Sequence, residues 1–588
     1  MSLEHTFEVW APYANAVSVT CDGVEHAMSP ASRDWWRATV RAVTPEPSYA
    51  FRLDSSDQLL PDPRSQWQPE GVRGASRLVD HASFPWTDAT WTSRPLAGAV
   101  VYEMHIGTFT PGGTLDSAVE RLDHLAGLGV DFVELMPVNA FDGLYGWGYD
   151  GVCWYATHEE YGGPYALKRF VDACHARGIG VLLDVVYNHL GPTGSVLHHF
   201  APYQSDHGTD WGPAINLDGA DSDEVRRYIV DNAVTWLRDY HLDGLRLDAT
   251  DALLDRRATH LLEEIGLAVR RLQAHLGRSL VLIAESDLND PRVIAPREAG
   301  GHGIDAQWSD DFHHALHAAL TGEHHGYYAD FGGLSPLAQA LTNGFVLDGR
   351  VSVYRGRHHG RPIDTTRTPG WRLLGYAQNH DQVGNRPRGD RLASRVGSAR
   401  AKIAAALTLT GPSTPMLFMG EEWAAGTPFP FFSSFTDPVL AQQVREGRRR
   451  EFAAAGVAAD DMYDPQDPAT REAARLDWAE TARSGHLEVL DWYRRLIALR
   501  REHCDLTDPV LTSTSVRLDD AHGWLVLTRG TIAVACNISA SHRVVPVPGA
   551  GLGEVLLSSG AEADIRKDSL DLPPESVVIL RLVDPERP

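Results

Sequence analysis

Cysteine is scarce in this sequence. The 588 residues include five cysteines, which are far apart and form no Cys-x-x-Cys pair: Cys21, Cys153, Cys174, Cys504 and Cys536. A disulfide framework pairs its cysteines evenly, and a structural zinc site clusters them. The sequence therefore suggests neither a disulfide framework nor a structural zinc site, and it favours a reducing compartment.

Targeting signals and long apolar runs are also missing. Residues 1–6 contain no basic stretch followed by an apolar core, which a secretory signal would have. No uninterrupted apolar run reaches the roughly 20 residues that a membrane-spanning helix needs. We therefore expect a cytoplasmic protein with no membrane partner.

Positive charge is in short supply. The chain has 53 Lys and Arg against 78 Asp and Glu, a formal net charge of −25 at pH 7. An acidic chain disfavours nucleic acid as a partner and fits a neutral or cationic ligand. The sequence also lacks a phosphate-binding Gly-Lys-Ser/Thr loop, a Gly-x-Ser-x-Gly elbow and a dinucleotide-binding glycine motif. These absences exclude nucleotide-dependent and serine-hydrolase chemistry, and we expect no cofactor.

Three regions of different pattern follow one another. Residues 1–92 contain short strand-like runs between turn formers, at 6–10, 16–20, 36–40 and 49–53. Residues 502–588 contain similar runs at 516–518, 524–527, 532–535 and 577–580. We predict a β-sandwich domain at each end of the chain.

Residues 97–501 alternate strand-like and helix-like segments. One amphipathic helix ends at Gly178 and has apolar residues at helical spacing, namely Leu167, Phe170, Val171 and Cys174. Another is predicted to begin at Asp221, with Glu224 in the spacing of a capping box. The buried strands are predicted at 100–106, 131–138, 179–186, a run ending at Asp248, 280–284, 304–308, 373–378 and 415–419. Eight parallel strands covered by helices predict an α/β fold, a (β/α)₈ TIM barrel between the two sandwiches.

Four short segments place acidic residues just after predicted strands. They contain, in order, Asp184 with His189, Arg246 with Asp248, Glu285, and His380 with Asp381. Each segment alone is compatible with an ordinary strand end or a solvated loop. Because reactive groups of a barrel lie beyond the carboxyl ends of its strands, their joint order indicates carboxylate chemistry at one end.

Strand geometry separates the expected roles of two carboxylates. Arg246 and Asp248 lie on the same side of their strand because side chains alternate, and a nearby cation favours an ionised carboxylate. Asp248 is thus predicted to be anionic, as a nucleophile must be. Glu285 follows the apolar residues 281–284. Burial there raises a carboxyl pKa and keeps the proton that a general acid donates.

Histidine pairs offer a competing interpretation. His313 and His317 have the i, i+4 spacing of half a zinc site, but the glutamate of a His-Glu-x-x-His motif is absent. We expect solvated or sugar-contacting histidines and no metal.

The four segments resemble the motif regions of the α-amylase superfamily, glycoside hydrolase family 13, over essentially the whole chain. The resemblance implies that Asp248 is the nucleophile, that Glu285 is the acid/base, and that Asp381 is a third carboxylate that binds the hydroxyls of the distorted sugar. It implies supporting, substrate-binding roles for Tyr149, Asp184, His189, Arg246 and His380. Asn188 matches a position that helps to bind calcium in many α-amylases, but nothing here resembles their full calcium-binding domain, so no structural ion is expected.

Further segments are similar to the maltooligosyltrehalose trehalohydrolase group of that family. They are residues 101–114, 307–314, 379–386, 420–423 and 431–435. This resemblance implies cleavage of the α-1,4 bond beside a terminal trehalose, releasing trehalose and a maltooligosaccharide. The implied partners are maltooligosyltrehalose, maltooligosaccharides and a maltooligosyltrehalose synthase that acts beforehand. The N-terminal sandwich is implied to be carbohydrate-binding-like.

Three alternatives stay open at this point. A glucan branching enzyme and an α-1,6 debranching hydrolase share the same carboxylates, and a silent carbohydrate-binding protein shares the fold. Candidate sugar-stacking rings are Trp147, Tyr149 and Trp211. Candidates for recognition of the trehalose end are Asp310, Tyr327 and Glu422.

Overall fold

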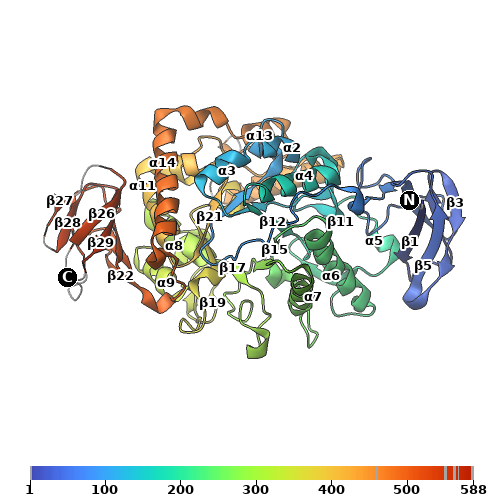
Figure 1. The fold of residues 1–588 in the computed structure, drawn as a ribbon, viewed down its shortest axis with the longest axis horizontal. Coiled ribbons are helices and arrows are strands. Elements are labelled where there is room, and N and C mark those ends of the chain that lie inside the picture. Colours follow the sequence, from blue (N-terminus) through green and yellow to red (C-terminus); the bar gives the residue numbers. More distant parts are fainter. Residues whose placement is uncertain are drawn as a thin grey trace.

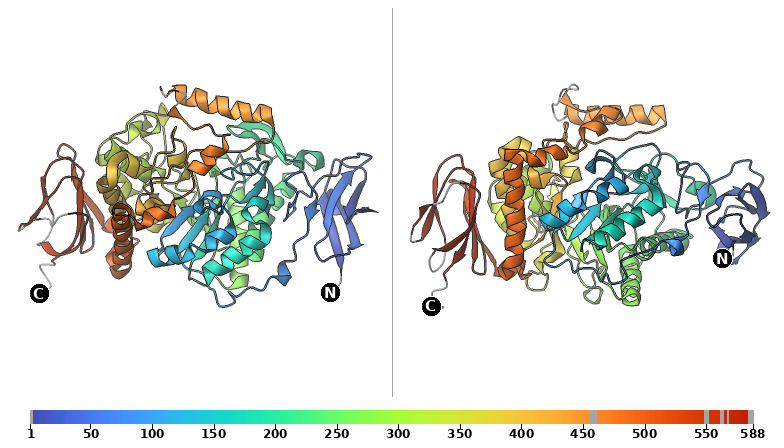
Figure 2. Two further views of the ribbon diagram at one scale, coloured as in Figure 1. Left: turned by 90° about the horizontal axis from the view of Figure 1, so that it is seen from above. Right: turned by 45° about the horizontal axis from the view of Figure 1, so that its top comes forward.

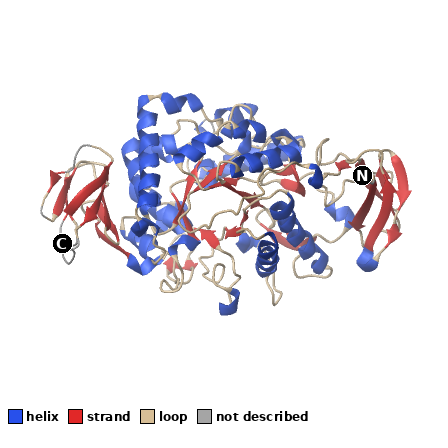
Figure 3. Ribbon diagram, in the orientation of Figure 1, coloured by secondary structure: helices blue, strands red, loops and turns tan. Residues whose placement is uncertain are grey.

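The computed structural model describes residues 3–583 except 455, 457, 459–460, 548–551, 561–563 and 567. A central helix-covered barrel lies between two β-rich units, one at each end of the molecule (Figures 1 and 2). Strands dominate both ends and helices surround the middle (Figure 3). The predicted fold class is confirmed. No helix of the described ranges is long and apolar enough to cross a membrane.

The N-terminal sandwich packs two antiparallel sheets. One has the order β1 (Glu4–Trp10), β5 (Trp35–Arg41) and β4 (Ser29–Pro30), and the other has β3 (Val24–Ala27), β2 (Val17–Cys21), β6 (Ser48–Leu53) and β7 (Ser76–Arg77). Phe7, Val19 and Phe51 are buried between the sheets, because alternate side chains of each strand face inward.

The barrel closes from eight parallel strands at the eight predicted places. In spatial order they are β8 (Val101–Met104), β9 (Phe132–Leu135), β12 (Gly180–Val185), β15 (Gly244–Leu247), β16 (Val281–Ala284), β17 (Ala306–Trp308), β20 (Leu373–Tyr376) and β21 (Thr414–Phe418). Short antiparallel pairs lie outside the barrel: β10 (Asn139–Phe141) with β11 (Gly151–Thr157), β13 (Gln204–Thr209) with β14 (Gly212–Ile215), and β18 (Val351–Ser352) with β19 (Arg357–His358).

The barrel interior changes from apolar to charged along its axis. Val101 and Leu182 belong to a buried apolar cluster inside it. Two positions further along the same strands stand Glu103 and Asp184, both almost fully buried. Period-two alternation therefore brings the charged residues to the carboxyl end of the barrel.

Helices cover the outside of the barrel. The longer ones are α3 (Leu122–Leu128), α4 (Gly163–His175), α6 (Ser222–Asp239), α7 (Leu261–Leu276), α8 (Asp310–Thr321), α9 (Ser335–Asn343), α11 (Leu392–Thr410), α12 (Pro438–Ala454) and α14 (Ser484–Glu502). Short ones are α1 (Ile106–Phe109), α2 (Leu115–Val119), α5 (Leu197–Phe200), α10 (His380–Gly384), α13 (Pro468–Ala473) and α15 (Cys504–Thr507). In α4 the four predicted apolar residues are buried, and Gly178 follows with a left-handed φ of +75°.

The predicted capping box of α6 is wrong. Asp221 does occupy the N-cap position, but its φ is 59° and its side chain makes no cap hydrogen bond. The left-handed backbone there turns the carboxylate away from the first-turn amides that an N-cap residue normally binds. Glu224 instead accepts a hydrogen bond from Trp35 Nε1 of the N-terminal sandwich, at 3.2 Å.

The C-terminal sandwich also packs two sheets. The larger has the order β22 (Thr514–Asp519), β23 (Trp524–Arg529), β24 (Ile532–Asn537), β29 (Ser576–Leu582) and β26 (Leu552–Ser558), and the smaller has β25 (Arg543–Pro546), β28 (Ser569–Leu572) and β27 (Asp564–Ile565). Arg529 is buried and donates to the carbonyl oxygens of Thr410 and Asp508, which ties this sandwich to the end of α11.

Candidate active site

Three carboxylates come together beyond the strand ends. Asp248 directly follows β15, Glu285 directly follows β16, and Asp381 lies in α10 after β20. All three line one cavity of about 600 Å³. Tyr149, His189 and His380 line the same cavity, and Arg246 and Asp184 lie buried beside it.

Arg246 connects the carboxylates. Its Nη1 donates to Asp248 Oδ1 at 2.7 Å and to Asp184 Oδ2 at 2.6 Å, and its Nη2 forms an ion pair with Glu285 Oε2 at 2.7 Å. The guanidinium carbon lies 4.1 Å from the centroid of the Trp308 ring. Because Arg246 is fully buried, these contacts hold one fixed cation among three carboxylates.

The environment of Glu285 suits a proton donor. Burial raises the pKa of its carboxyl group, and the opposing attraction of Arg246 is too weak to cancel that effect. The backbone N–H of Ala249 donates to Glu285 Oε2 at 2.9 Å. The direction of the shift, and its cause, agree with the prediction from the apolar strand before Glu285.

Asp248 is held from two sides. Asn188 Nδ2 donates to Asp248 Oδ2 at 2.7 Å, while Arg246 holds Oδ1. Asn188 Oδ1 in turn lies 2.5 Å from His189 Nδ1. Since both oxygens of Asp248 are engaged, its carboxylate has one fixed orientation toward the cavity.

His380 is a buried cation next to Asp381. Burial opposes its charge, but the carboxylates of Asp381 and Glu103 outweigh burial and raise the His380 pKa to about 9. The Tyr149 ring stacks on His380 with centroids 5.0 Å apart, and its hydroxyl donates to Asp184 at 2.6 Å. The side chain of Asp381 is 37% exposed, against 12% for Asp248, so Asp381 is the more open to a ligand.

The candidate stacking rings differ in access. Trp211 is 50% exposed and stacks on His189 with centroids 5.8 Å apart, so one face is available to a sugar ring. Trp147 is 4% exposed and stacks on Phe429. Trp147 lines the carboxylate cavity but also packs against Phe429 and His380, so its role as a sugar platform stays a prediction.

Comparisons with known proteins show the family of this chain. Residues 74–212 match the family model described as alpha amylase, catalytic domain, and residues 509–579 match a domain of unknown function, DUF3459. A malto-oligosyltrehalose trehalohydrolase from Mycobacterium tuberculosis is 50% identical over 98% of this chain and 99% of its own. The chain belongs to the malto-oligosyltrehalose trehalohydrolase family.

Two further relatives cover almost the whole chain. A malto-oligosyltrehalose trehalohydrolase from Arthrobacter ramosus is 51% identical over 98% of this chain and all of its own length. A crystal structure of a candidate alpha amylase from Salmonella typhimurium superposes with a TM-score of 0.90 at 38% identity, covering 98% of both chains.

The three candidates for trehalose recognition differ in their burial and in their contacts. Glu422 is fully buried away from the cavity and accepts hydrogen bonds from Tyr102 and His124, so that expectation is wrong. It lies in a tight turn after β21 that directs its side chain toward those two residues. Asp310 accepts a hydrogen bond from Tyr376, and Tyr327 is partly buried beside Tyr328.

The paired histidines of α8, His313 and His317, are buried. His313 is 1% exposed, stacks on Tyr376 and lies 3.2 Å from the Tyr328 hydroxyl, while His317 bonds Glu323 at 2.6 Å. The expected solvated state is wrong because the i, i+4 face of α8 packs inward. The residues that the structure describes contain no group of three or more side chains suited to holding a metal ion.

Sequence reasoning missed Glu103 and misjudged Asn188. Glu103 bonds both the backbone and the ring of His380, and Asn188 bonds Asp248. A signal for Glu103 was available, since a charged residue in the middle of an apolar barrel strand requires a partner. The sequence comparison relates Asn188 only to a calcium-binding position of α-amylases, although Asn188 directly precedes His189 in the first motif.

Proposed function

We propose that this protein is a retaining glycoside hydrolase that cleaves the α-1,4 bond beside the terminal trehalose of maltooligosyltrehalose. The observation that carries the proposal is the shared contact of Asp248 and Glu285 with Arg246 at one cavity. The names of relatives about 50% identical over nearly the full chain support the substrate class.

The mechanism follows from the two carboxyl groups. Asp248 attacks the anomeric carbon while Glu285 donates its proton to the leaving glycosidic oxygen, so a covalent glycosyl-enzyme forms and trehalose departs. Glu285, now ionised, takes a proton from water, which attacks the same carbon and releases the maltooligosaccharide. Two inversions retain the α configuration. A carboxyl separation of about 5–5.5 Å is expected for this course.

The surrounding residues assist each step. Arg246 and Asn188 fix the Asp248 carboxylate, and the buried setting of Glu285 keeps its proton available. Asp381 and the imidazolium of His380 are placed to bind sugar hydroxyls, and Tyr149 and Trp211 to pack against sugar rings.

Chemistry also suggests the setting of the reaction. Its substrate must come from an enzyme that builds the α,α-1,1 end on a maltooligosaccharide, so we infer functional coupling to a maltooligosyltrehalose synthase.

The five cysteines are all free thiols, which suits a cytoplasmic location. The charge of −25 suits a neutral glucan and disfavours nucleic acid.

Product analysis tests the proposal. The enzyme is incubated separately with maltotriosyltrehalose, a linear maltooligosaccharide and a branched glucan. Trehalose and maltotriose from the first, released faster than any product from the other two, are expected. Longer branched products would indicate a branching enzyme, and preferential cleavage of the branched glucan would indicate a debranching hydrolase. No product from any substrate would indicate a silent binding protein.

A further inference from the structure

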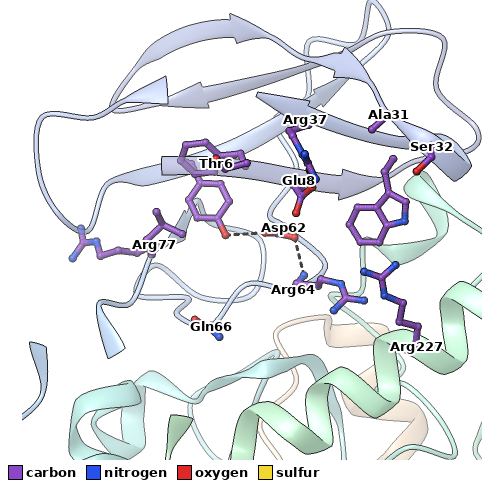
Figure 4. Close-up of a pocket in the computed structure, with 14 residues that line it drawn as sticks. Thr6, Glu8, Ala31, Ser32, Arg37, Asp62, Arg64, Gln66, Arg77 and Arg227 are labelled. Atoms are coloured by element: carbon purple, nitrogen blue, oxygen red, sulfur yellow. Dashed lines mark hydrogen bonds and ion pairs between the residues drawn. The ribbon is translucent and has the colours of Figure 1, made fainter. Parts of the chain in front are cut away.

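Arginine side chains line two separate cavities. One lies where the N-terminal sandwich meets the barrel, and Figure 4 shows its four arginines and two carboxylates: Arg37, Arg64, Arg77, Arg227, Glu8 and Asp62. Arg37 donates to Glu8 at 2.6 Å and Arg64 to Asp231 at 2.9 Å, so these charges join strands and domains. The other is the carboxylate cavity, where Arg448 of α12 takes no part in the mechanism above.

Two hydrogen bonds lead from Arg448 to the third carboxylate. Arg448 Nη2 donates to Asn385 Oδ1 at 3.0 Å, and Asn385 Nδ2 donates to Asp381 Oδ1 at 3.3 Å. A guanidinium group only donates hydrogen bonds, so it selects the oxygen of the Asn385 amide. The NH₂ group of that amide is thereby turned toward the Asp381 carboxylate, which accepts.

Arg448 is itself held in place. Its Nη1 donates to Glu451 Oε2 at 3.1 Å, three residues further along α12, and its guanidinium carbon lies 4.6 Å from the centroid of the Phe431 ring. Its side chain is 19% exposed. A planar cation that is stacked on a ring and bonded through both Nη atoms has little freedom left to lose when a substrate binds.

Asp381 needs such support more than the other two carboxylates of the cavity. Both of those contact Arg246 directly, at 2.7 Å. His380 Nε2, in contrast, lies 3.6 Å from Asp381 Oδ2, beyond the usual length of a hydrogen bond. The Asn385 amide engages the other oxygen, Oδ1. Because His380 and Asn385 act on different oxygens, together they set the orientation of the carboxylate.

We propose that Arg448 is a positioning residue for hydrolysis, which acts through Asn385 to hold Asp381 in the orientation that binds the distorted sugar. The proposal rests on the proposed function for the role of Asp381. The hydroxyls of the sugar move as its ring distorts, so a fixed Asp381 fits the transition state better than the ground state. A carboxylate that turns freely loses that preference, and the loss falls on kcat.

Steady-state kinetics test the positioning role. Arg448→Met keeps an unbranched stem over Phe431 but removes the donors. It should lower kcat for maltotriosyltrehalose by about tenfold to hundredfold and change KM by less than about threefold. Arg448→Lys keeps a donor on a flexible stem and should recover part of the rate. Arg450→Met changes an exposed arginine of the same helix and should keep both constants. Equal melting temperatures of the variants show that α12 stays folded.

A double-mutant cycle separates positioning from direct sugar binding. Asn385→Ala should lower kcat about as much as Arg448→Met, and the double variant should lose little more, because both changes break the same chain of contacts. Additive losses would mean that Arg448 acts on the sugar by itself and would overturn the proposal. An unchanged kcat in Arg448→Met, or an equal loss in Arg450→Met, would overturn it as well.

Crystal structures without sugar give a test that does not depend on the substrate. The Asp381 carboxylate should keep its orientation in Arg450→Met and turn away from it in Arg448→Met. An Asp381 that stays in place in Arg448→Met would refute the positioning role whatever glucan the enzyme cleaves. A wild-type enzyme that releases no trehalose would contradict the proposed function instead, and the two crystal structures would still decide how Asp381 is held.

Discussion

Glu103 and His380 are joined by two hydrogen bonds although 277 positions separate them in the chain. Glu103 Oε1 lies 2.5 Å from His380 Nδ1, and Oε2 accepts the His380 backbone N–H at 3.0 Å. Both residues are 1% exposed. Glu103 therefore acts as a positioning residue that orients His380 and stabilises its charge beside Asp381.

Replacing Glu103 should change the pH dependence of hydrolysis. The His380 pKa of about 9 means that the imidazolium exists below that pH and is lost above it. Glu103→Gln removes one of the carboxylates that raise this pKa, so the alkaline limb of the kcat profile should move to lower pH. Rates measured from pH 5 to pH 10 check this.

Glu134 provides the matched control for that experiment. It is the register partner of Glu103 on the next strand, and burial raises its pKa well above the usual range. Burial favours the neutral form of Glu134, so Glu134→Gln removes less negative charge than Glu103→Gln and should leave the alkaline limb in place. An unchanged limb in Glu103→Gln, or an equal shift in both variants, would refute the positioning role.

Asp248→Asn should abolish trehalose release, by about 10³-fold or more, because no covalent intermediate can form. The fold should persist, since Arg246 keeps its contacts with Asp184 and Glu285. Turnover of maltotriosyltrehalose and the circular dichroism melting curve measure the two effects. Asp251→Asn changes another carboxylate of the same cavity and should retain activity. Full activity in Asp248→Asn would rule out its role as nucleophile.

Arg246→Gln should destabilise the barrel by about 3–5 kcal/mol, because the variant leaves buried carboxylates without their cation. Burial then raises the folded-state pKa of Asp184 and Glu285 further above the unfolded values, so their neutral forms favour folding at low pH. Stability should be lost as pH rises, and the deficit against wild type should be larger at pH 8 than at pH 5. Urea unfolding at both pH values measures it, and an equal deficit at each would contradict this account.

Trp211→Ala should raise KM for maltotriosyltrehalose by about tenfold and change kcat less, because an exposed stacking ring contributes mainly to binding. Trp211→Phe keeps a ring on His189 and should recover most of the affinity. Steady-state kinetics separate the two constants. If the alanine variant keeps the wild-type KM, Trp211 is not a sugar platform.

Local sequence patterns were sufficient to predict the barrel and the order of its acidic segments. Alternation of side chains along a strand predicted that Arg246 and Asp248 share a side, and the contact of 2.7 Å agrees. The apolar strand before Glu285 likewise predicted the direction of its pKa shift. These features depend on residues a few positions apart, which is the range that periodicity describes.

The amino-acid sequence by itself determined eight strands, two flanking sandwiches and the carboxylates that follow the strands. Only the tertiary structure decided that one arginine serves Asp184, Asp248 and Glu285, that Glu103 holds His380, and that Glu422 and His317 face away from the cavity. The physical reason is barrel closure. Pairing of β21 with β8 brings residues hundreds of positions apart into contact, and the partner that a buried charge then meets is set by packing and register across the closed sheet.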